Sequence, residues 1–255
     1  MSLFLFDIDG TILRGSTEVH RAAFAYAYQE IYGLDLSLDG IVAAGRTDAW
    51  LFEEPLRRAR VPYERVQRNR LEAFAVMEAY VTEHLEDLRD RVLPGVREVL
   101  SELREACQTL GLLTGNLEGV AAAKMVRAGL EDYFQFGVYG SESVDRSQLV
   151  PIALRLARTS GVVESQTQAT VIGDTPLDIA AARDHNLRSV AVATGPFSVE
   201  DLRCAGADLV FESLAEPETV RRLLDRHDLE RPASSRRTDG DCLPRSVTHQ
   251  RRPNR

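Results

Sequence analysis

The sequence lacks any long hydrophobic run. Its first apolar stretch, Leu3–Phe6, is only four residues long before Asp7 interrupts it, and no later stretch approaches about 18 apolar residues. A stretch this short is too small for the core of a signal peptide or for a membrane span. We therefore expect a cytoplasmic protein with no membrane partner.

Cysteine is also scarce. The three cysteines, Cys107, Cys204 and Cys242, lie far apart and form no Cys-x-x-Cys pair, and the five histidines include no pair at metal-ligand spacing. This pattern predicts reduced structural thiols, and it argues against a disulfide framework or a zinc site.

Lysine is nearly absent, since Lys124 is the single lysine among 31 basic residues. The formal net charge is −8, but seven arginines and two acids give residues 231–255 a charge of +5, which leaves −13 for residues 1–230. The acidic body argues against nucleic acid as a partner, because phosphate contacts need clustered cations. Residues 229–255 have little to bury and are expected to form a disordered, Arg-rich tail, with an arm that binds nucleic acid or an anionic surface as the alternative.

Short apolar runs alternate with helix-like periodicity along most of the chain. Strands are expected at 3–6, 110–113, 136–139, 170–172, 189–192 and 209–211. This alternation is typical of an α/β fold with a doubly wound parallel sheet.

One long segment departs from this alternation. Residues 15–93 carry only helical patterns, with helices expected at about 19–31, 49–59 and 63–88 and with Pro55 interrupting the second. We therefore expect an α/β core made of residues 1–14 and 94–228, and an all-helical cap made of residues 15–93.

The first predicted strand ends in a loop that carries two acids, Asp7 and Asp9, followed by Gly10 and Thr11. In an open α/β sheet, ligands bind beyond the carboxyl ends of the strands. Two carboxylates there can bind a hard cation, and an aspartate can attack a phosphoryl group. An ordinary Asp-Gly turn after a core strand is the alternative.

Three later segments carry polar residues suited to phosphate. The Thr-Gly-Asn motif at 114–116 precedes a helix, where it can form an anion cradle or merely cap the helix. Arg146 begins a further helix and can clamp phosphoryl oxygens, unless it is a solvated surface arginine. In the Gly-Asp-x-x-x-Asp motif at 173–178, Asp174 suits a metal ligand or a helix cap.

The order of these motifs resembles that of the haloacid dehalogenase-like (HAD) superfamily of hydrolases. The resemblance covers about residues 1–225 and is strongest to the phosphoglycolate phosphatase-like branch, in which a helical (C1-type) cap follows the first motif. It implies that Asp7 is the nucleophile and a Mg²⁺ ligand. It also implies that Asp9 is the general acid/base and gives its backbone carbonyl to the metal, and that Asp174 completes the metal site.

The resemblance also implies residues that bind phosphate. Thr114 would hydrogen-bond the transferring phosphoryl group with support from Asn116, and Asp178 would brace the basic residue of the third motif. The complete phosphate-binding set expected from the resemblance is Gly10, Thr11, Thr114, Gly115, Asn116 and Arg146.

The third motif of the superfamily usually supplies a lysine. Here Arg146 stands at that place in the order, and we assign the role to it, although arginine is planar and bidentate where lysine is a point charge. Lys124 is the weaker candidate, because it lies about two turns into the helix after Thr114 and is expected to point away. Arg46 is the cap residue expected to reach the substrate, by resemblance to the specificity loop of such caps, with a surface arginine beside a turn as the alternative.

These residues imply a Mg²⁺-dependent phosphatase that hydrolyses a small phosphate monoester, phosphoglycolate-like or a sugar phosphate, through an aspartyl-phosphate intermediate. Asp9 argues against a haloacid dehalogenase, whose leaving halide needs no proton. Residues 15–93 contain no lysine, which argues against a phosphonoacetaldehyde hydrolase and its Schiff base. A β-phosphoglucomutase-like phosphotransferase and a catalytically idle binding module remain as alternatives.

Overall fold

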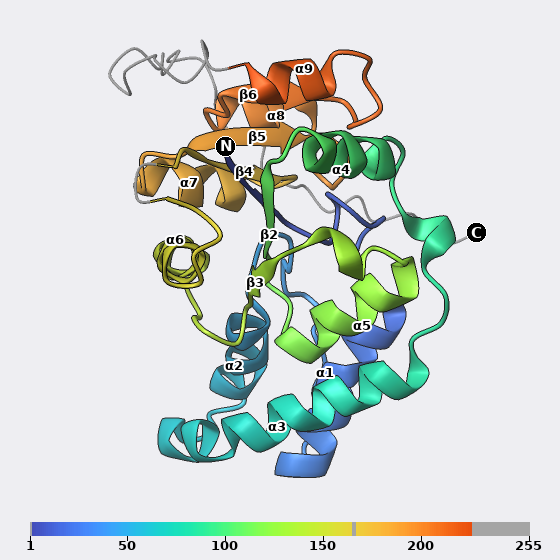
Figure 1. Cartoon of the computed structure of the whole chain (residues 1–255). Coiled ribbons are helices and arrows are strands. Elements are labelled where there is room, and N and C mark those ends of the chain that lie inside the picture. Colours follow the sequence, from blue (N-terminus) through green and yellow to red (C-terminus); the bar gives the residue numbers. More distant parts are fainter. Residues whose placement is uncertain (1, 165–166, 226–255) are drawn as a thin grey trace, which may run out of the picture.

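The computed structural model describes residues 2–164 and 167–225. Its centre is a six-stranded sheet with the order β3-β2-β1-β4-β5-β6, in which every pairing is parallel (Figure 1). The strands are β1 (Leu3–Phe6), β2 (Thr109–Leu113), β3 (Phe136–Val138), β4 (Ala169–Gly173), β5 (Arg188–Val192) and β6 (Leu209–Phe211). The prediction of an α/β fold with a parallel sheet is confirmed.

Helices cover both faces of this sheet. They are α4 (Val96–Glu105), α5 (Glu118–Ala128), α6 (Leu149–Thr159), α7 (Pro176–Asp184), α8 (Val199–Cys204) and α9 (Thr219–Leu224). Successive side chains of β1 point to opposite faces, so Phe4 and Phe6 join the cluster that includes α4 and α5, whereas Leu3 and Leu5 pack with α6 and α7. Burial on both faces explains why β1 is a continuous apolar run.

A helical segment separates β1 from α4. It contains α1 (Glu18–Tyr32), α2 (Asp48–Arg58) and α3 (Tyr63–His84), which lie together at one end of the molecule, away from α8 and α9 (Figure 1). The ring of Phe52 lies 5.4 Å from that of Tyr28 and 5.5 Å from that of Phe74, so one aromatic cluster joins all three helices. Gly33, at φ +66°, ends α1 in the left-handed conformation that glycine favours.

Several local predictions are wrong. Helix α3 ends at His84 rather than at 88, and Pro55 lies inside α2 without interrupting it. The short helices α8 and α9 were not predicted. Cys107 is free and exposed, but Cys204 is disulfide-bonded, so the prediction of reduced thiols is wrong for that residue.

The structure bears only in part on the expectations about a membrane and about the C-terminal tail. None of the described helices is long and apolar enough to cross a membrane. The predicted tail, residues 229–255, lies outside the described residues.

Candidate active site

Asp7 and Asp174 leave adjacent strands at the same edge of the sheet. Phe6 pairs with Ile172, and the amide of Asp7 donates to the carbonyl of Ile172 at 2.9 Å. This register brings the end of β1 beside the end of β4. Gly10 turns the chain at φ +93°, and a Cβ there would lie only 2.2 Å from Oδ2 of Asp174, so the close approach requires glycine.

Three buried carboxylates meet at this edge. Oxygens of Asp7, Asp174 and Asp178 all lie within 4.8 Å of one another. Burial raises the pKa of Asp7 to about 6, even though the nearby charge of Arg146 opposes the shift. Burial, followed by the charges of Asp7 and Asp178, raises the pKa of Asp174 to about 9. The cluster therefore holds more negative charge than the neighbouring cation balances.

Both carboxylate oxygens of Asp178 already accept hydrogen bonds from neighbouring residues. Its Oδ1 accepts from Nε of Arg146 at 2.9 Å, and its Oδ2 accepts from the backbone amide and the hydroxyl of Thr175 at 3.1 and 2.7 Å. Asp178 therefore braces Arg146, in the position predicted for it, and completes a capping box. The cap of α7 is Thr175, so Asp174 is not used as a helix cap.

Asp7 and Asp174 remain able to bind a cation. Asp174 accepts one side-chain hydrogen bond, from the hydroxyl of Thr11 at 3.4 Å. Carboxylate oxygens are the ligands that hard divalent cations prefer, and such an ion would offset the cost of burying two ionised carboxylates together. The donor set therefore fits a divalent ion held by these two acids.

Arg146 lies where the prediction placed it. Its side chain is buried, and Nη2 lies 3.0 Å from Oδ1 of Asp7 and 2.6 Å from Oδ1 of Asp178. Burial alone would lower the pKa of the guanidinium, but the charges of Asp178 and Asp7 raise it above its usual value. The group stays cationic beside the proposed nucleophile.

Lys124 also lies in the site, and the prediction that it points away is wrong. Its fully buried Nζ lies 2.5 Å from Oδ2 of Asp9 and donates to Oδ1 of Asn116 at 2.6 Å. Burial tends to raise the pKa of Asp9, but the charge of Lys124 and the hydrogen bonds from Lys124 and Asn116 outweigh this and lower it. Lys124 shares the buried face of α5 with Val120, Ala121, Met125 and Ala128, and that periodicity was the available sequence signal.

The turn after β2 carries Thr114, Gly115 and Asn116. The hydroxyl of Thr114 is fully buried and accepts from the backbone amide and Nδ2 of Asn116, at 3.3 and 2.8 Å. Neither side chain caps α5; the amide of Leu117 donates instead to Oδ2 of Asp48 at 2.8 Å. The two motif side chains therefore remain at the site rather than serving the helix end.

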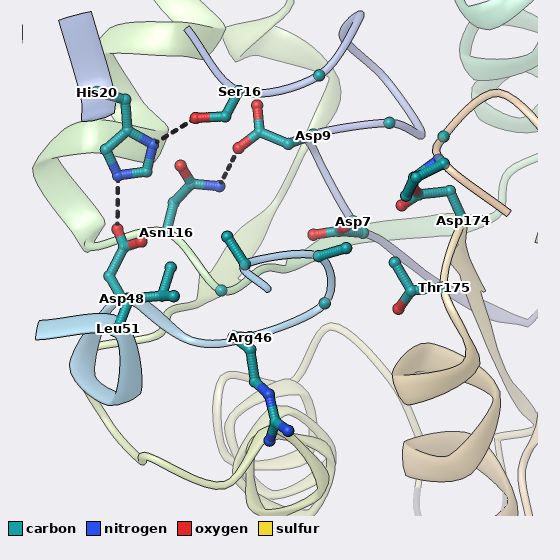
Figure 2. A pocket seen from close by; sticks show the side chains of 18 of the residues that line it. Asp7, Asp9, Ser16, His20, Arg46, Asp48, Leu51, Asn116, Asp174 and Thr175 are labelled. Carbon is teal, nitrogen blue, oxygen red and sulfur yellow. Dashed lines mark hydrogen bonds and ion pairs between the residues drawn. The ribbon is translucent and has the colours of Figure 1, made fainter. Parts of the chain in front are cut away.

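The helical segment touches the core at this turn. The amide of Asp48 donates to the carbonyl of Gly115 at 2.6 Å, and the hydroxyl of Thr47 donates to the carbonyl of Val144 at 3.2 Å. A Cβ on Gly115 would lie 2.3 Å from the carbonyl oxygen of Arg46, so the two backbones are in direct contact. Together, segment and core enclose a cavity of about 400 Å³ over the acids (Figure 2).

Arg46 does not reach into this cavity with its charge. Its guanidinium carbon lies 4.4 Å from the centre of the Trp50 ring, and Figure 2 shows the side chain directed away from Asp7 and Asp174. The expected contact between Arg46 and a substrate is therefore not supported by this conformation. Arg14 and Arg21 are the other arginines of the helical side that line the cavity.

Sequence reasoning missed two residues of the site, His20 and Asp48. The imidazole of His20 is buried on the inner face of α1, with Nε2 2.9 Å from Oδ2 of Asp48 and Nδ1 3.2 Å from Nζ of Lys124. His20 shares the buried face of α1 with Ala23 and Phe24, so an apolar face interrupted by a histidine was the signal.

A buried guanidinium and buried carboxylates line one cavity at the ligand-binding edge of the sheet, an arrangement that fits an α/β enzyme acting on an anionic group. A protein-family model described as a haloacid dehalogenase-like hydrolase matches residues 1–186 of the chain. The chain belongs to this family of hydrolases.

Individual relatives are similar over most of the chain. A phosphoglycolate phosphatase of Caulobacter vibrioides is 28% identical over 222 residues, which cover 83% of this chain and 86% of that protein. A relative from Caldanaerobacter subterraneus, whose name describes it as a pyrophosphatase, PpaX, is 24% identical over 82% of this chain and 90% of that protein. A β-phosphoglucomutase from Clostridium difficile has the same fold, with a TM-score of 0.62, 19% identity, and coverage of 87% and 96% of the two chains.

Proposed function

We propose that this enzyme is a Mg²⁺-dependent phosphatase that hydrolyses a small phosphate monoester through an aspartyl-phosphate intermediate. The observation that carries the proposal is the convergence of Asp7, Asp174 and Arg146, whose carboxylates and guanidinium lie together in the lining of one cavity. The names of the phosphatase relatives agree with this chemistry.

In the first half of the reaction, a carboxylate oxygen of Asp7 attacks phosphorus while the bond to the leaving oxygen breaks. A phosphate dianion repels this carboxylate, and Arg146 and the hydroxyl of Thr114 offset that repulsion at the phosphoryl oxygens. Asp7, Asp174 and the backbone carbonyl of Asp9 would hold Mg²⁺, which would supply further positive charge there. Asp9 gives its proton to the leaving oxygen; because Lys124 lowers the pKa of Asp9, this step requires the negative charge of the bound phosphate ester to raise that pKa again.

In the second half, water attacks the phosphorus of the aspartyl-phosphate. Asp9, now a carboxylate, takes a proton from that water, and the bond between Asp7 and phosphorus breaks to release inorganic phosphate. The free oxygen for both proton transfers is Oδ1 of Asp9, which is buried and has no hydrogen-bond partner among the described residues. The products are the alcohol and inorganic phosphate, and Asp7 and Asp9 return to their starting forms.

We propose that residues 15–93 act as a cap over this chemistry, with residues 1–14 and 94–228 as the core. The hydrogen bonds from Thr47 and Asp48 hold this segment against the core beside the cavity, where a cap would exclude water from the reaction. Its volume of about 400 Å³ suits a small ester such as phosphoglycolate or a sugar phosphate.

The test is a screen of phosphoglycolate, sugar phosphates and an aryl phosphate, in which released phosphate is measured with Mg²⁺ and with a chelator. We expect Mg²⁺-dependent release from at least one ester and none from Asp7→Asn. Isomerisation of a hexose phosphate without phosphate release would instead support the phosphotransferase. No turnover of any ester would support an idle binding module and overturn the proposal.

A further inference from the structure

The single lysine of the chain is enclosed by hydrogen-bond acceptors. Lys124 is fully buried, and its Nζ lies 2.5 Å from Oδ2 of Asp9, 2.6 Å from Oδ1 of Asn116 and 3.2 Å from Nδ1 of His20. An ammonium group has three hydrogens, and each of these three atoms can accept one. The position of Nζ is therefore fixed from three sides.

This arrangement fixes the plane of the Asp9 carboxylate. Oδ2 accepts from Nζ of Lys124 and, at 3.0 Å, from Nδ2 of Asn116, whereas Oδ1 accepts nothing among the described residues. Two donors on one oxygen restrict rotation of the carboxyl group. The same two contacts set the direction of the other oxygen, Oδ1, which is buried and has no partner among the described residues.

A further series of contacts runs from Lys124 through His20 to Asp48 in the proposed cap. Nδ1 of His20 lies 3.2 Å from Nζ of Lys124, which can only donate, and 3.2 Å from the hydroxyl of Ser16. These contacts favour the tautomer with the ring proton on Nε2, which donates to Oδ2 of Asp48 at 2.9 Å. Asp48 in turn accepts from the amide of Leu117 at 2.8 Å. Figure 2 shows His20 beside Asp48, and Asn116 reaching toward Asp9.

We propose, on the basis of the function proposed above, that Lys124 is a positioning residue that aims Oδ1 of Asp9 at the leaving-group oxygen, and that His20 holds Lys124 in place. Stability alone gives a poor account of this lysine, because a buried ion pair often stabilises no better than apolar side chains of the same volume. The role lies in directing one oxygen of the acid rather than in binding phosphate, which Arg146 does.

The test compares two substrates that differ in their need for a proton. An alkyl phosphate releases a basic alkoxide that must be protonated, whereas p-nitrophenyl phosphate releases a phenolate that leaves without a proton. The value of kcat/KM reports the step in which Asp7 is phosphorylated, so later hydrolysis of the intermediate does not enter it. We expect Lys124→Met to lower kcat/KM about 100-fold for the alkyl ester and less than about 10-fold for the aryl ester.

Two further variants keep the test sharp. His20→Leu retains the contact between Lys124 and Asp9 but removes its support, so a smaller loss, about 10-fold and again confined to the alkyl ester, is expected. This variant also tests the proposal if Lys124→Met fails to fold. Met125→Leu is the control: it alters the neighbouring buried residue of α5 without touching Asp9, so kcat/KM should change little, and by the same factor for both esters.

The outcomes separate this inference from the function on which it rests. Equal losses for both esters in Lys124→Met and His20→Leu, or no loss in either variant, would overturn the positioning role while leaving the phosphatase intact. Absence of turnover in the unaltered protein would overturn the proposed function and the positioning role together.

Discussion

Nη2 of Arg146 lies 3.0 Å from Oδ1 of Asp7, so the proposed nucleophile has a buried cation as its direct neighbour. The same guanidinium forms an ion pair with Asp178, whose position is fixed by the capping box of α7. The helix start, the brace and the cation thus form one rigid unit behind Asp7, and this unit motivates the first prediction.

Replacement of Arg146 tests whether the planar guanidinium, with its several hydrogen-bond donors, is needed, or only its positive charge. Arg146→Met should lower kcat/KM by about 10²–10³-fold, because a charge that stabilises the transition state is lost. Arg146→Lys should retain part of the activity, since it keeps the charge but cannot contact Asp7 and Asp178 with the same geometry. Steady-state kinetics on one phosphate ester gives both values. Activity of Arg146→Met equal to that of the unaltered protein would remove Arg146 from the mechanism.

Asp7→Asn should abolish turnover without unfolding the chain. We expect kcat to fall by more than about 10⁴-fold, because an amide cannot replace the carboxylate as nucleophile. Without metal, the melting temperature should stay equal or rise, since the charge of Asp7 repels Asp174 and contributes to its raised pKa. Phosphate release and thermal unfolding in a chelator check the two parts separately. Turnover at the normal rate would contradict the assignment of the nucleophile.

The acid pair should make stability depend on pH and Mg²⁺ together. Folding raises the pKa of Asp7 to about 6 and that of Asp174 to about 9, from 3.8, so the folded chain binds more protons than the unfolded chain between about pH 4 and 9. Without metal, the free energy of unfolding should therefore fall as pH rises through this window, on the order of 1 kcal/mol per pH unit.

Mg²⁺ should reverse this loss by competing with the protons. The increase in melting temperature caused by Mg²⁺ should be larger at pH 8.5 than at pH 6, and Asp174→Asn should remove most of it at both. Differential scanning calorimetry with Mg²⁺ and with a chelator measures the shift. A Mg²⁺ effect that is the same at both pH values, or that survives in Asp174→Asn, would contradict a site built from these acids.

Arg46 and the arginines of the cavity should behave differently. Arg46→Ala is expected to change the ratio of kcat/KM between acidic and neutral esters by less than about threefold, because the guanidinium stacks on Trp50 and is directed away from Asp7, although Arg46 is among the residues that line the cavity. Arg14→Ala and Arg21→Ala are the matched comparisons, since both residues line the cavity. A selective loss of acidic substrates in Arg46→Ala alone would restore the role that the sequence suggested.

The sequence by itself determined the sheet and the acids at its edge. Short apolar runs that end in Asp-x-Asp or Gly-Asp are local patterns, and parallel strands necessarily bring their carboxyl ends to one edge, so Asp7 and Asp174 could be placed from spacing alone. Arg146 followed from the same order of motifs. The helical character of residues 15–93 followed from periodicity.

Only the tertiary structure decided how side chains on helices face the site. The direction of a helical side chain depends on how the helix is rotated against the sheet, which no local pattern fixes. Packing of α5 turns Lys124 inward to Asp9, packing of α1 brings His20 to Asp48, and stacking on Trp50 turns Arg46 outward. Contacts between residues far apart in the sequence settle these directions, because burial and pairing of charge outweigh the preferences of any single segment.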